Sequence, residues 1–342
     1  MQPEEIDKFK TTKIIFMIGI GGSNLAAKAV WNALTLHNSE IEKKIIFLEA
    51  PDEREYLEAR KLIDEIQNLE DFVLATVSKS GETRETLETF KNISEILLQK
   101  FGEKFSERSF VVSTESSTLW KLSSDKGIRC IPWEKNIGGR FSAFTVAHTL
   151  VLEIAGLDTK TFIKEGKEME ETCKLENSPA KNLADKIFES YKNGVEILDF
   201  FIFNSELEDL GKWCRQLIAE SLGKKNKKGE RIGIVPTVSI GPTDLHSILQ
   251  LDLGGPRNRF TIFIKSTKEI DEVMNESSYK NTKEAYEKTS LPFEKFEMSE
   301  INEGEIGKFM SLMMQTTISL GELLEVDIFD QPEVEEYKKN LL

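Results

Sequence analysis

Hydroxyl side chains gather around one lysine at residues 78–86, where the sequence reads Ser-Lys-Ser-Gly-Glu-Thr-Arg-Glu-Thr. An apolar run, residues 72–77, comes before them and a helical pattern comes after, so they lie where a strand ends and a helix begins. Parallel sheets bind ligands at that edge, and the free N–H groups of a helix amino terminus favour anions. We therefore predict a monophosphate site, for which an ordinary Ser/Thr helix cap is the alternative. Its members would be Ser78, Lys79, Ser80, Thr83 and Thr86.

A glycine-rich turn, Gly-Ile-Gly-Gly-Ser at residues 19–23, follows the first apolar run of the chain. Glycines let a ligand approach the backbone closely. A G-x-G turn after a strand also suggests a dinucleotide site, with Glu49 as the acid that binds the ribose. The third glycine of that fingerprint would fall at Asn24, so the NAD motif is incomplete.

A second glycine pair, Gly138 and Gly139, comes before Arg140 and a predicted helix at residues 142–155. Paired glycines permit a tight turn, and a guanidinium beyond them can face a phosphate or a developing oxyanion. A surface ion pair is the ordinary role of a single arginine, and that alternative stays open. Loops of this kind nevertheless often carry functional residues.

Two candidate catalytic side chains lie in the second half of the chain. A helical pattern that ends at Gly223 places Glu220 on the same face as Trp213 and Leu217. Partial desolvation there would raise the pKa of the carboxyl toward the range of a general base, whereas a solvated glutamate is the alternative. His246 lies in the first turn of another predicted helix, where a structural role is the alternative.

The composition narrows the classes of function. The chain has 342 residues, 39% of them hydrophobic, which is enough for two domains with their own cores. Its formal net charge of −14 argues against binding nucleic acid or anionic membranes, because both need a basic surface. Three widely spaced cysteines and three histidines without metal-ligand spacing indicate neither a disulfide framework nor a metal site. We find no membrane span or signal peptide and expect a cytoplasmic protein.

Strand and helix patterns alternate along the chain. Strands are expected at residues 14–18, 44–48, 72–77, 109–113, 200–203, 231–235 and 259–264, and in the second half helices are expected from about residues 206, 243 and 304. This order predicts parallel sheets covered by helices on both faces. A highly charged stretch separates the strands of the first half from those of the second half, and its clearest break is Ser178-Pro179. The fold class is therefore α/β, with two flavodoxin-like sandwich domains at residues 1–178 and 179–342.

These motifs, in this order and with Asp330-Gln331 and Lys338 at the end, resemble the glucose-6-phosphate isomerase family. The resemblance runs from about Ile18 to the carboxyl terminus, and the Gly-Gly-Arg and Asp-Gln…Lys segments are its most specific parts. It implies two sugar isomerase (SIS) domains. It also implies an isomerase of glycolysis and gluconeogenesis, which converts glucose 6-phosphate to fructose 6-phosphate by ring opening and a cis-enediolate. Neither a cofactor nor a metal is implied.

The resemblance assigns a role to each matched position. Glu220 matches the base that moves the proton, and Arg140 matches the arginine that stabilises the enediolate. His246 and Lys338 match the pair assigned to ring opening, and in the family the histidine comes from a partner subunit. A homodimer with His246 contributed across the interface is thus implied. The sugar phosphate would be bound by Gly22, Ser23, Ser78, Lys79, Ser80, Thr83, Thr86 and Gln331.

Two other interpretations stay open. A bifunctional phosphoglucose/phosphomannose isomerase would also convert mannose 6-phosphate. A non-catalytic sugar-phosphate sensor would bind without turnover, and the complete set of Glu220, His246, Lys338 and Arg140 argues against it. The chain departs from the family pattern at residues 146–148, where Val-Ala-His replaces a run that contains Pro and Gly.

Overall fold

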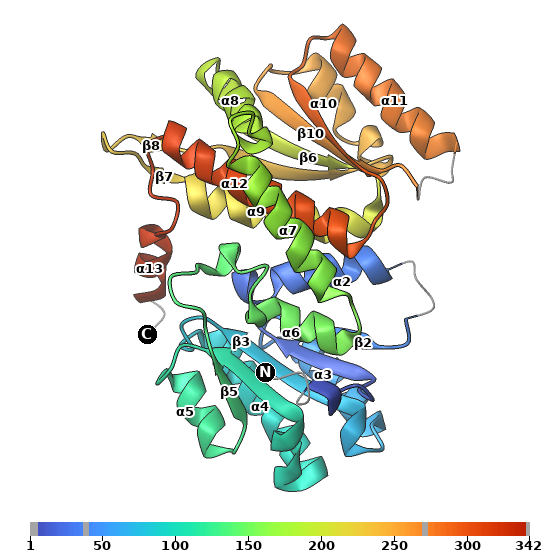
Figure 1. The fold of residues 1–342 in the computed structure, drawn as a ribbon, viewed down its shortest axis with the longest axis vertical. Coiled ribbons are helices and arrows are strands. Elements are labelled where there is room, and N and C mark those ends of the chain that lie inside the picture. Colours follow the sequence, from blue (N-terminus) through green and yellow to red (C-terminus); the bar gives the residue numbers. More distant parts are fainter. Residues whose placement is uncertain (1–5, 37–40, 269–272, 340–342) are drawn as a thin grey trace. The chain divides into compact units, whose positions relative to one another are not determined.

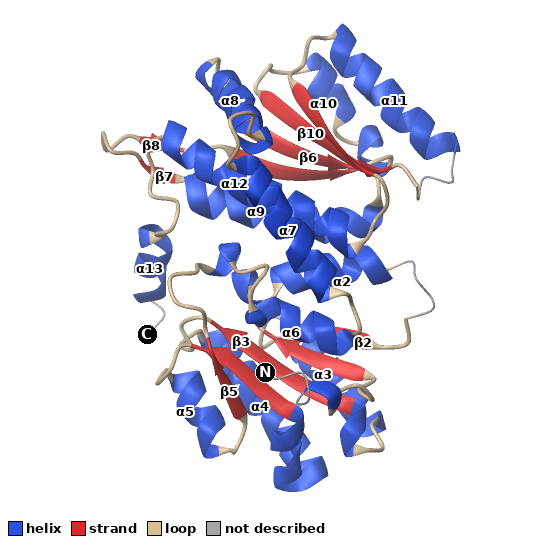
Figure 2. Cartoon of the chain, in the orientation of Figure 1, coloured by secondary structure: helices blue, strands red, loops and turns tan. Residues whose placement is uncertain are grey.

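The chain folds into two compact units (Figure 1). One unit comprises the chain up to Trp31 together with Thr35–Thr159, and the other comprises Asn32–Leu34 and the chain from Lys160 onward. Both units combine parallel strands with helices (Figure 2). The computed structural model describes residues 6–36, 41–268 and 273–339.

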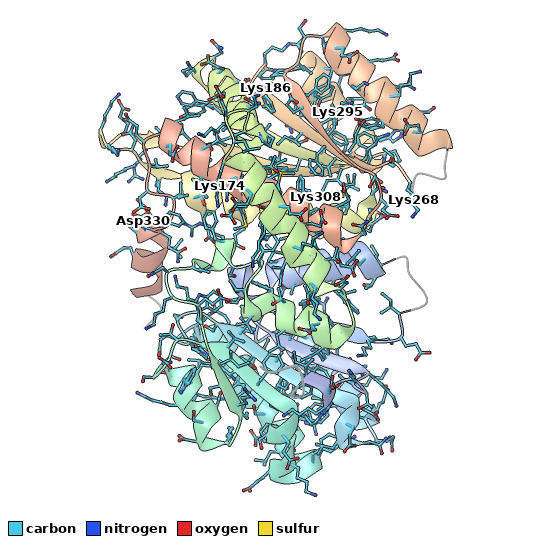
Figure 3. All side chains as sticks on the ribbon, viewed as in Figure 1. Lys174, Lys186, Lys268, Lys295, Lys308 and Asp330 are labelled. Atoms are coloured by element: carbon cyan, nitrogen blue, oxygen red, sulfur yellow. The ribbon has the colours of Figure 1, made fainter. Side chains whose placement is uncertain are left out.

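The division between the units lies one helix before the boundary expected at 178/179. Helix α7 (Thr159–Cys173) clusters with the second unit apart from its first residue. Its Glu165 forms an ion pair of 3.3 Å with Lys308 of α12 (Glu303–Leu323), a lysine that is labelled in Figure 3. Packing of α7 against another helix of the second unit is a contact that the charge pattern of the sequence does not reveal.

A five-stranded parallel sheet forms the centre of the first unit, with the strand order β2-β1-β3-β4-β5. All seven residues of β3 are buried, as expected for a central strand that is covered on both faces. The four strands predicted in this half are confirmed, whereas β5 is short and was not predicted. The strands are β1 (Ile14–Ile18), β2 (Lys44–Leu48), β3 (Phe72–Ser78), β4 (Ser109–Ser113) and β5 (Arg129–Pro132).

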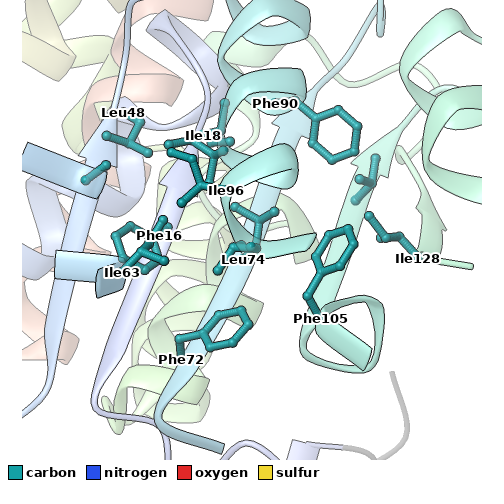
Figure 4. Packing of buried hydrophobic residues seen from close by; sticks show 14 of the residues in the cluster. Phe16, Ile18, Leu48, Ile63, Phe72, Leu74, Phe90, Ile96, Phe105 and Ile128 are labelled. Carbon is teal, nitrogen blue, oxygen red and sulfur yellow. The ribbon is translucent and has the colours of Figure 1, made fainter. Parts of the chain in front are cut away.

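Apolar side chains from the strands and helices of the first unit form one core cluster (Figure 4). Phe16 and Leu74 come from neighbouring strands, Ile63 comes from α3 and Phe90 from α4. This packing fixes α4 against β3 and thereby positions the turn that joins them. The helices are α2 (Leu25–Thr35), α3 (Glu53–Glu65), α4 (Arg84–Phe101), α5 (Thr118–Asp125) and α6 (Val146–Ala155).

A four-stranded parallel sheet, in the order β11-β10-β6-β9, forms the centre of the second unit. The prediction of a strand at residues 231–235 is wrong, because the parallel strand β9 begins only at Val235, where that range ends. The preceding pair Arg231–Ile232 (β8) is antiparallel to Lys224–Lys225 (β7) instead. The sheet strands are β6 (Ile197–Ile202), β9 (Val235–Ile240), β10 (Arg259–Ser266) and β11 (Phe293–Met298).

The helices of the second unit agree with the predicted starts near residues 206 and 304, but not with the start near 243. Residues Thr243–His246 form a 3-10 turn (η6), because Asp244 Oδ2 accepts a hydrogen bond from Ile240 N (2.7 Å) and does not cap a helix. In the part of the chain that the structure describes, no helix has the length and apolar character needed to span a membrane. Besides α7 and α12, the helices are α8 (Pro179–Lys192), α9 (Glu208–Leu222), α10 (Leu249–Gly254), α11 (Val273–Lys288) and α13 (Pro332–Lys339).

Two buried carboxylates share one arginine in the second unit. Arg259 Nε lies 3.0 Å from Asp252 Oδ1, and Arg259 Nη1 lies 3.4 Å from Asp199 Oδ1. Burial raises the pKa of both carboxyls, and the guanidinium opposes this by favouring their charged forms. Arg259 therefore compensates charge that would otherwise be costly to bury.

Arg259→Met is expected to lower the free energy of unfolding by about 3–5 kcal/mol, because it leaves two buried carboxylates without their cation. Urea unfolding at neutral pH measures the change. Arg231→Met is the matched control, because Arg231 is exposed on β8 and should change stability by less than about 0.5 kcal/mol. Equal effects of the two substitutions would show that the ion cluster does not stabilise the fold.

Candidate active site

The turn between β3 and α4 carries the predicted hydroxyl cluster. Ser78 is buried at the end of β3, and its Oγ accepts a hydrogen bond from Gly81 N (3.1 Å). Ser80 Oγ accepts from Glu82 N (3.2 Å). Thr83 Oγ1 lies 3.4 Å from Ser78 Oγ and 3.5 Å from Ser80 Oγ. The structure thus brings three of the predicted hydroxyls together at the amino terminus of α4.

The segment that follows β4 holds this turn in place. Gly81 has a φ of +65°, and a Cβ at this position would lie 2.1 Å from Ser117 Oγ, so glycine is required here. The carbonyl of Lys79 accepts a hydrogen bond from Thr114 Oγ1 (2.6 Å). Glu82 accepts one from the N–H of Thr118 (2.8 Å). These contacts preform the turn, so binding an anion need not order it.

Lys79 and Thr86 differ in their access to solvent. The side chain of Lys79 is exposed beside the hydroxyl cluster. Thr86 lies inside the first turn of α4 with an exposed fraction of 2%, and its Oγ1 has no hydrogen-bond partner within the described residues. Thr86 is therefore not bonded to the hydroxyls of the turn, and its contribution to phosphate binding stays a prediction.

The two glycine-rich turns of the first unit are packed against each other. A Cβ on Gly22 would lie 2.5 Å from the carbonyl carbon of Gly139 and 2.8 Å from the backbone N of Arg140. No side chain fits at Gly22 unless that backbone moves. The close approach explains why the turn Gly21–Ser23 (η1) needs glycine beside the turn Gly139–Phe141 (η4).

Arg140 is buried, with an exposed fraction of 3%, and its guanidinium carbon lies 5.7 Å from the centre of the Phe141 ring. A guanidinium held inside the protein can stabilise negative charge more strongly than one in water. Glu49, the acid considered for a dinucleotide ribose, accepts hydrogen bonds from Asn24 Nδ2 (2.9 Å) and Lys28 Nζ (2.7 Å). Its carboxylate is thus engaged by the same unit of the protein.

His148, on α6, joins these two turns and was not predicted as a site residue. Its Nδ1 accepts a hydrogen bond from Ala27 N (3.3 Å), and its Nε2 lies 2.9 Å from Ser142 Oγ and 3.2 Å from Gly22 O. The ring is completely buried, and this lowers the pKa of His148 to about 4. The sequence analysis named this histidine only as part of the run Val-Ala-His at residues 146–148.

Glu220 lies in the last turn of α9 and is half-buried. Trp213 and Leu217 on the same helix are buried, as the predicted helical face requires. Gln216 Nε2 donates a hydrogen bond to Glu220 Oε1 (2.8 Å) and so orients the carboxylate. The Oε1 atom of Gln216 is buried without a hydrogen-bond partner among the described residues. The sequence analysis missed Gln216, although its position four residues before Glu220 places both on one helix face.

Lys224, two residues beyond α9, anchors the segment that leads to Gln331. Its buried ammonium donates hydrogen bonds to the carbonyl of Asp327, the carbonyl of Asp330 (2.8 Å) and Asp330 Oδ1 (2.7 Å). Asp330 is labelled in Figure 3, and Gln331 follows it directly as the last residue before α13. The anchor thus joins the end of the Glu220 helix to the segment that carries a predicted substrate ligand.

The remaining predicted residues are placed on other elements. Ser23 ends η1 beside Gly22 and is partly exposed. His246 ends η6 and is exposed. Lys338 falls in α13, and its side chain lies outside the described residues. Within the described residues, no group of three or more His, Cys, Asp or Glu side chains is arranged to hold a metal ion.

Each unit carries its own candidate functional groups. The first unit provides an anion seat at a helix amino terminus and a buried guanidinium. The second unit provides a carboxylate whose orientation is fixed by a neighbouring amide. An oriented carboxylate can remove a proton from carbon, and a buried guanidinium can stabilise the negative charge that then develops.

Comparisons with known proteins find relatives that match most of the chain. The family model of phosphoglucose isomerase matches residues 6–281. A protein named "Probable glucose-6-phosphate isomerase" from Methanococcus maripaludis is 30% identical, over 96% of this chain and 78% of the relative. A "Glucose-6-phosphate isomerase" from Methanocaldococcus jannaschii is 29% identical, over 98% of this chain and 86% of the relative. The solved structure of a glucose-6-phosphate isomerase from Chlamydia trachomatis has the same fold, with a TM-score of 0.83 at 19% identity over 99% of this chain and 72% of that one.

Proposed function

Because the chain belongs to the phosphoglucose isomerase family, we propose that it interconverts glucose 6-phosphate and fructose 6-phosphate. The predicted α/β fold with parallel sheets is confirmed, and the solved structure from the family shares it. The observation that carries the proposal is the hydrogen bond from Gln216 that fixes the Glu220 carboxylate on α9. We place the reaction in glycolysis and gluconeogenesis, and the protein in the cytoplasm.

Phosphate binding is assigned to the turn between β3 and α4. Ser78, Ser80 and Thr83 offer hydroxyls that can donate to phosphate oxygens, and the exposed Lys79 adds a positive charge. The amino terminus of α4 adds backbone N–H groups. Binding the phosphate there fixes the sugar while the other residues act on its first two carbons, as tethering does in general.

Proton transfer is assigned to Glu220. Its carboxylate removes the proton from C2 of the open-chain aldose, and the electrons of that C–H bond form the C1–C2 double bond of a cis-enediolate. The electrons of the C1 carbonyl move to O1, and the hydroxyl proton of O2 passes to O1. The protonated carboxyl then returns its proton to C1 as the C2–O bond becomes the carbonyl, which gives the ketose without any net oxidant. Arg140 stabilises the negative oxygen of the intermediate. Gln216 Oε1, which has no hydrogen-bond partner within the described residues, accepts a hydrogen bond from a sugar hydroxyl.

Ring opening is assigned to His246 and Lys338. It moves a proton from the C1 hydroxyl to the ring oxygen as the C1–O bond breaks, so it needs a base and an acid. Gly22, Ser23 and Gln331 line the sugar in this assignment, and Thr86 supports the phosphate turn. The exposed position of His246 suits our further proposal that the protein is a homodimer in which this histidine serves the partner's site.

Turnover of fructose 6-phosphate in an assay coupled to glucose-6-phosphate oxidation tests the proposed function. Inorganic phosphate should inhibit competitively, because it binds the same turn as the substrate phosphate. Lys79→Ala should raise KM about tenfold or more and leave kcat nearly unchanged, since it removes a charged hydrogen bond in both ground and transition states. A protein that binds the sugar phosphate without turnover would be a sensor, and turnover of mannose 6-phosphate would indicate the bifunctional enzyme.

A mixing experiment tests the shared site. His246→Ala and Glu220→Gln proteins should each be nearly inactive, and mixing them should restore activity because some heterodimers then hold one intact site. Subunit exchange is verified separately with differently tagged chains. If exchange occurs and no activity returns, the two residues serve the same subunit.

A further inference from the structure

The contacts of His148 fix which ring nitrogen carries its proton. Nδ1 accepts a hydrogen bond from the backbone N–H of Ala27 (3.3 Å), so it must be unprotonated. The proton of the neutral ring is therefore on Nε2, which can donate to Ser142 Oγ (2.9 Å) and to Gly22 O (3.2 Å). Complete burial keeps the ring neutral at physiological pH.

Ser142 connects His148 to the second glycine-rich turn through hydrogen bonds. Its hydroxyl has one proton, and the shortest hydrogen bond that it can donate goes to Gly139 O (2.6 Å). The Nε2–H of His148 therefore donates to Ser142, and Ser142 donates to Gly139. Because each bond polarises the next, such a chain is stronger than its separate members.

Both ends of this chain of hydrogen bonds lie at the contact between the two glycine-rich turns. Gly139 O belongs to the peptide group that supplies the backbone N of Arg140, and Gly22 packs directly on that peptide group. His148 thus holds Gly22 by its own Nε2–H and holds Gly139 through Ser142. Loss of this donor would free both turns and, with them, the backbone that positions Arg140.

We propose that His148 is a positioning residue for the isomerase reaction, which acts by donating from Nε2 and thereby fixes the backbone of Arg140. The proposal rests on the proposed function, since it needs Arg140 to act on the enediolate. Among the described contacts of His148, only the one with Gly22 involves a residue that lines the sugar in the proposed assignment, and that contact is to its backbone carbonyl.

Two amide substitutions at His148 distinguish the contribution of Nε2 from that of Nδ1. The amide of a glutamine can reach the position of Nε2, so His148→Gln can still donate to Ser142 and Gly22. The amide of an asparagine reaches only the position of Nδ1, so His148→Asn keeps the contact with Ala27 and loses the donor. We expect kcat of His148→Gln to stay within about tenfold of the wild type, and kcat of His148→Asn to fall about 10²-fold, the loss typical of a small misplacement.

KM and stability distinguish positioning from a purely structural role. KM should change less than kcat in both variants, because the contacts of His148 among the described residues do not include the phosphate turn. Leu150→Ala, at a buried position on the same helix, is the control that should lower the melting temperature and leave kcat unchanged. Ser142→Ala breaks the same chain of hydrogen bonds and should also lower kcat, and it replaces His148→Asn if that variant does not fold.

The proposal is overturned if the glutamine and asparagine variants lose kcat equally, or if KM changes instead of kcat. It is also overturned if Leu150→Ala lowers kcat as much as His148→Asn, because the loss would then follow stability. A wild-type protein that does not turn over fructose 6-phosphate would refute the proposed function itself. A normal wild type with unaffected His148 and Ser142 variants would refute this inference and leave the function intact.

Discussion

Glu220→Gln is expected to lower turnover by about 10²–10⁴-fold and to leave sugar-phosphate binding in place. Glutamine keeps the size of the side chain and can still bond to Gln216, but it cannot accept the C2 proton. The loss should therefore appear in kcat. Deuterium from solvent should enter C1 of the fructose 6-phosphate formed by the wild type, since a half-buried carboxyl can exchange its proton with water before returning it.

Glu208→Gln is the matched control for this result. It is the same substitution on the same helix, at an exposed glutamate that pairs with Lys212 (2.9 Å), and it should leave kcat unchanged. Undiminished turnover in Glu220→Gln would remove Glu220 from the mechanism. The search for the base would then turn to another carboxylate, Glu85 in the first turn of α4 being the first candidate.

Arg140→Ala is expected to lower turnover by about 10²–10³-fold, the scale of losing one donor to a developing oxyanion. The charge that Arg140 stabilises arises in the enediolate, so the substitution should lower kcat more than it raises KM. Steady-state kinetics and inhibition by inorganic phosphate measure the two effects. Phosphate should bind the variant as it binds the wild type, because its turn lies on β3 and α4.

Arg129→Ala, which removes an exposed arginine on β5 of the same unit, is the control. Because Arg140 is buried, its replacement by alanine also leaves a cavity that can destabilise the fold. Circular dichroism therefore has to show that both variants are folded before their kcat values are compared. An equal loss of kcat in both variants, or a change confined to KM in Arg140→Ala, would contradict the assigned role.

The sequence predicted the fold best where strands are continuous apolar runs. Residues 72–77 are apolar or β-branched throughout and form most of the buried strand β3. The strand Val235–Ile240 contains Pro236, Thr237 and Ser239, and it lies at the edge of its sheet, so its pattern is weak. The turn at Thr243–His246 depends on a hydrogen bond between Asp244 and Ile240, which no local propensity encodes.

Local sequence patterns predicted part of the candidate site, and the contacts between distant residues could not be predicted from them. Hydroxyls and glycines near strand ends were visible because they are local motifs, and the structure confirms that Ser78, Ser80 and Thr83 lie together. Glu220 and Arg140 were candidates from a helix face and from a glycine pair, the family resemblance made their roles specific, and these roles stay proposals. His148 was missed because two of its partners, Ala27 and Gly22, lie 121 and 126 residues away along the chain, and such contacts exist only after folding.

The packing of Gly22 has a consequence for how this protein can evolve. In most of a protein core, a mutation to a larger side chain can be compensated by a smaller neighbour. The atoms that a Cβ on Gly22 would strike belong to the backbone of Gly139 and Arg140, and every amino acid carries those atoms. No second mutation at either neighbour can therefore make room. Gly22 is closed to compensatory change, and laboratory evolution of this enzyme should find its improvements elsewhere.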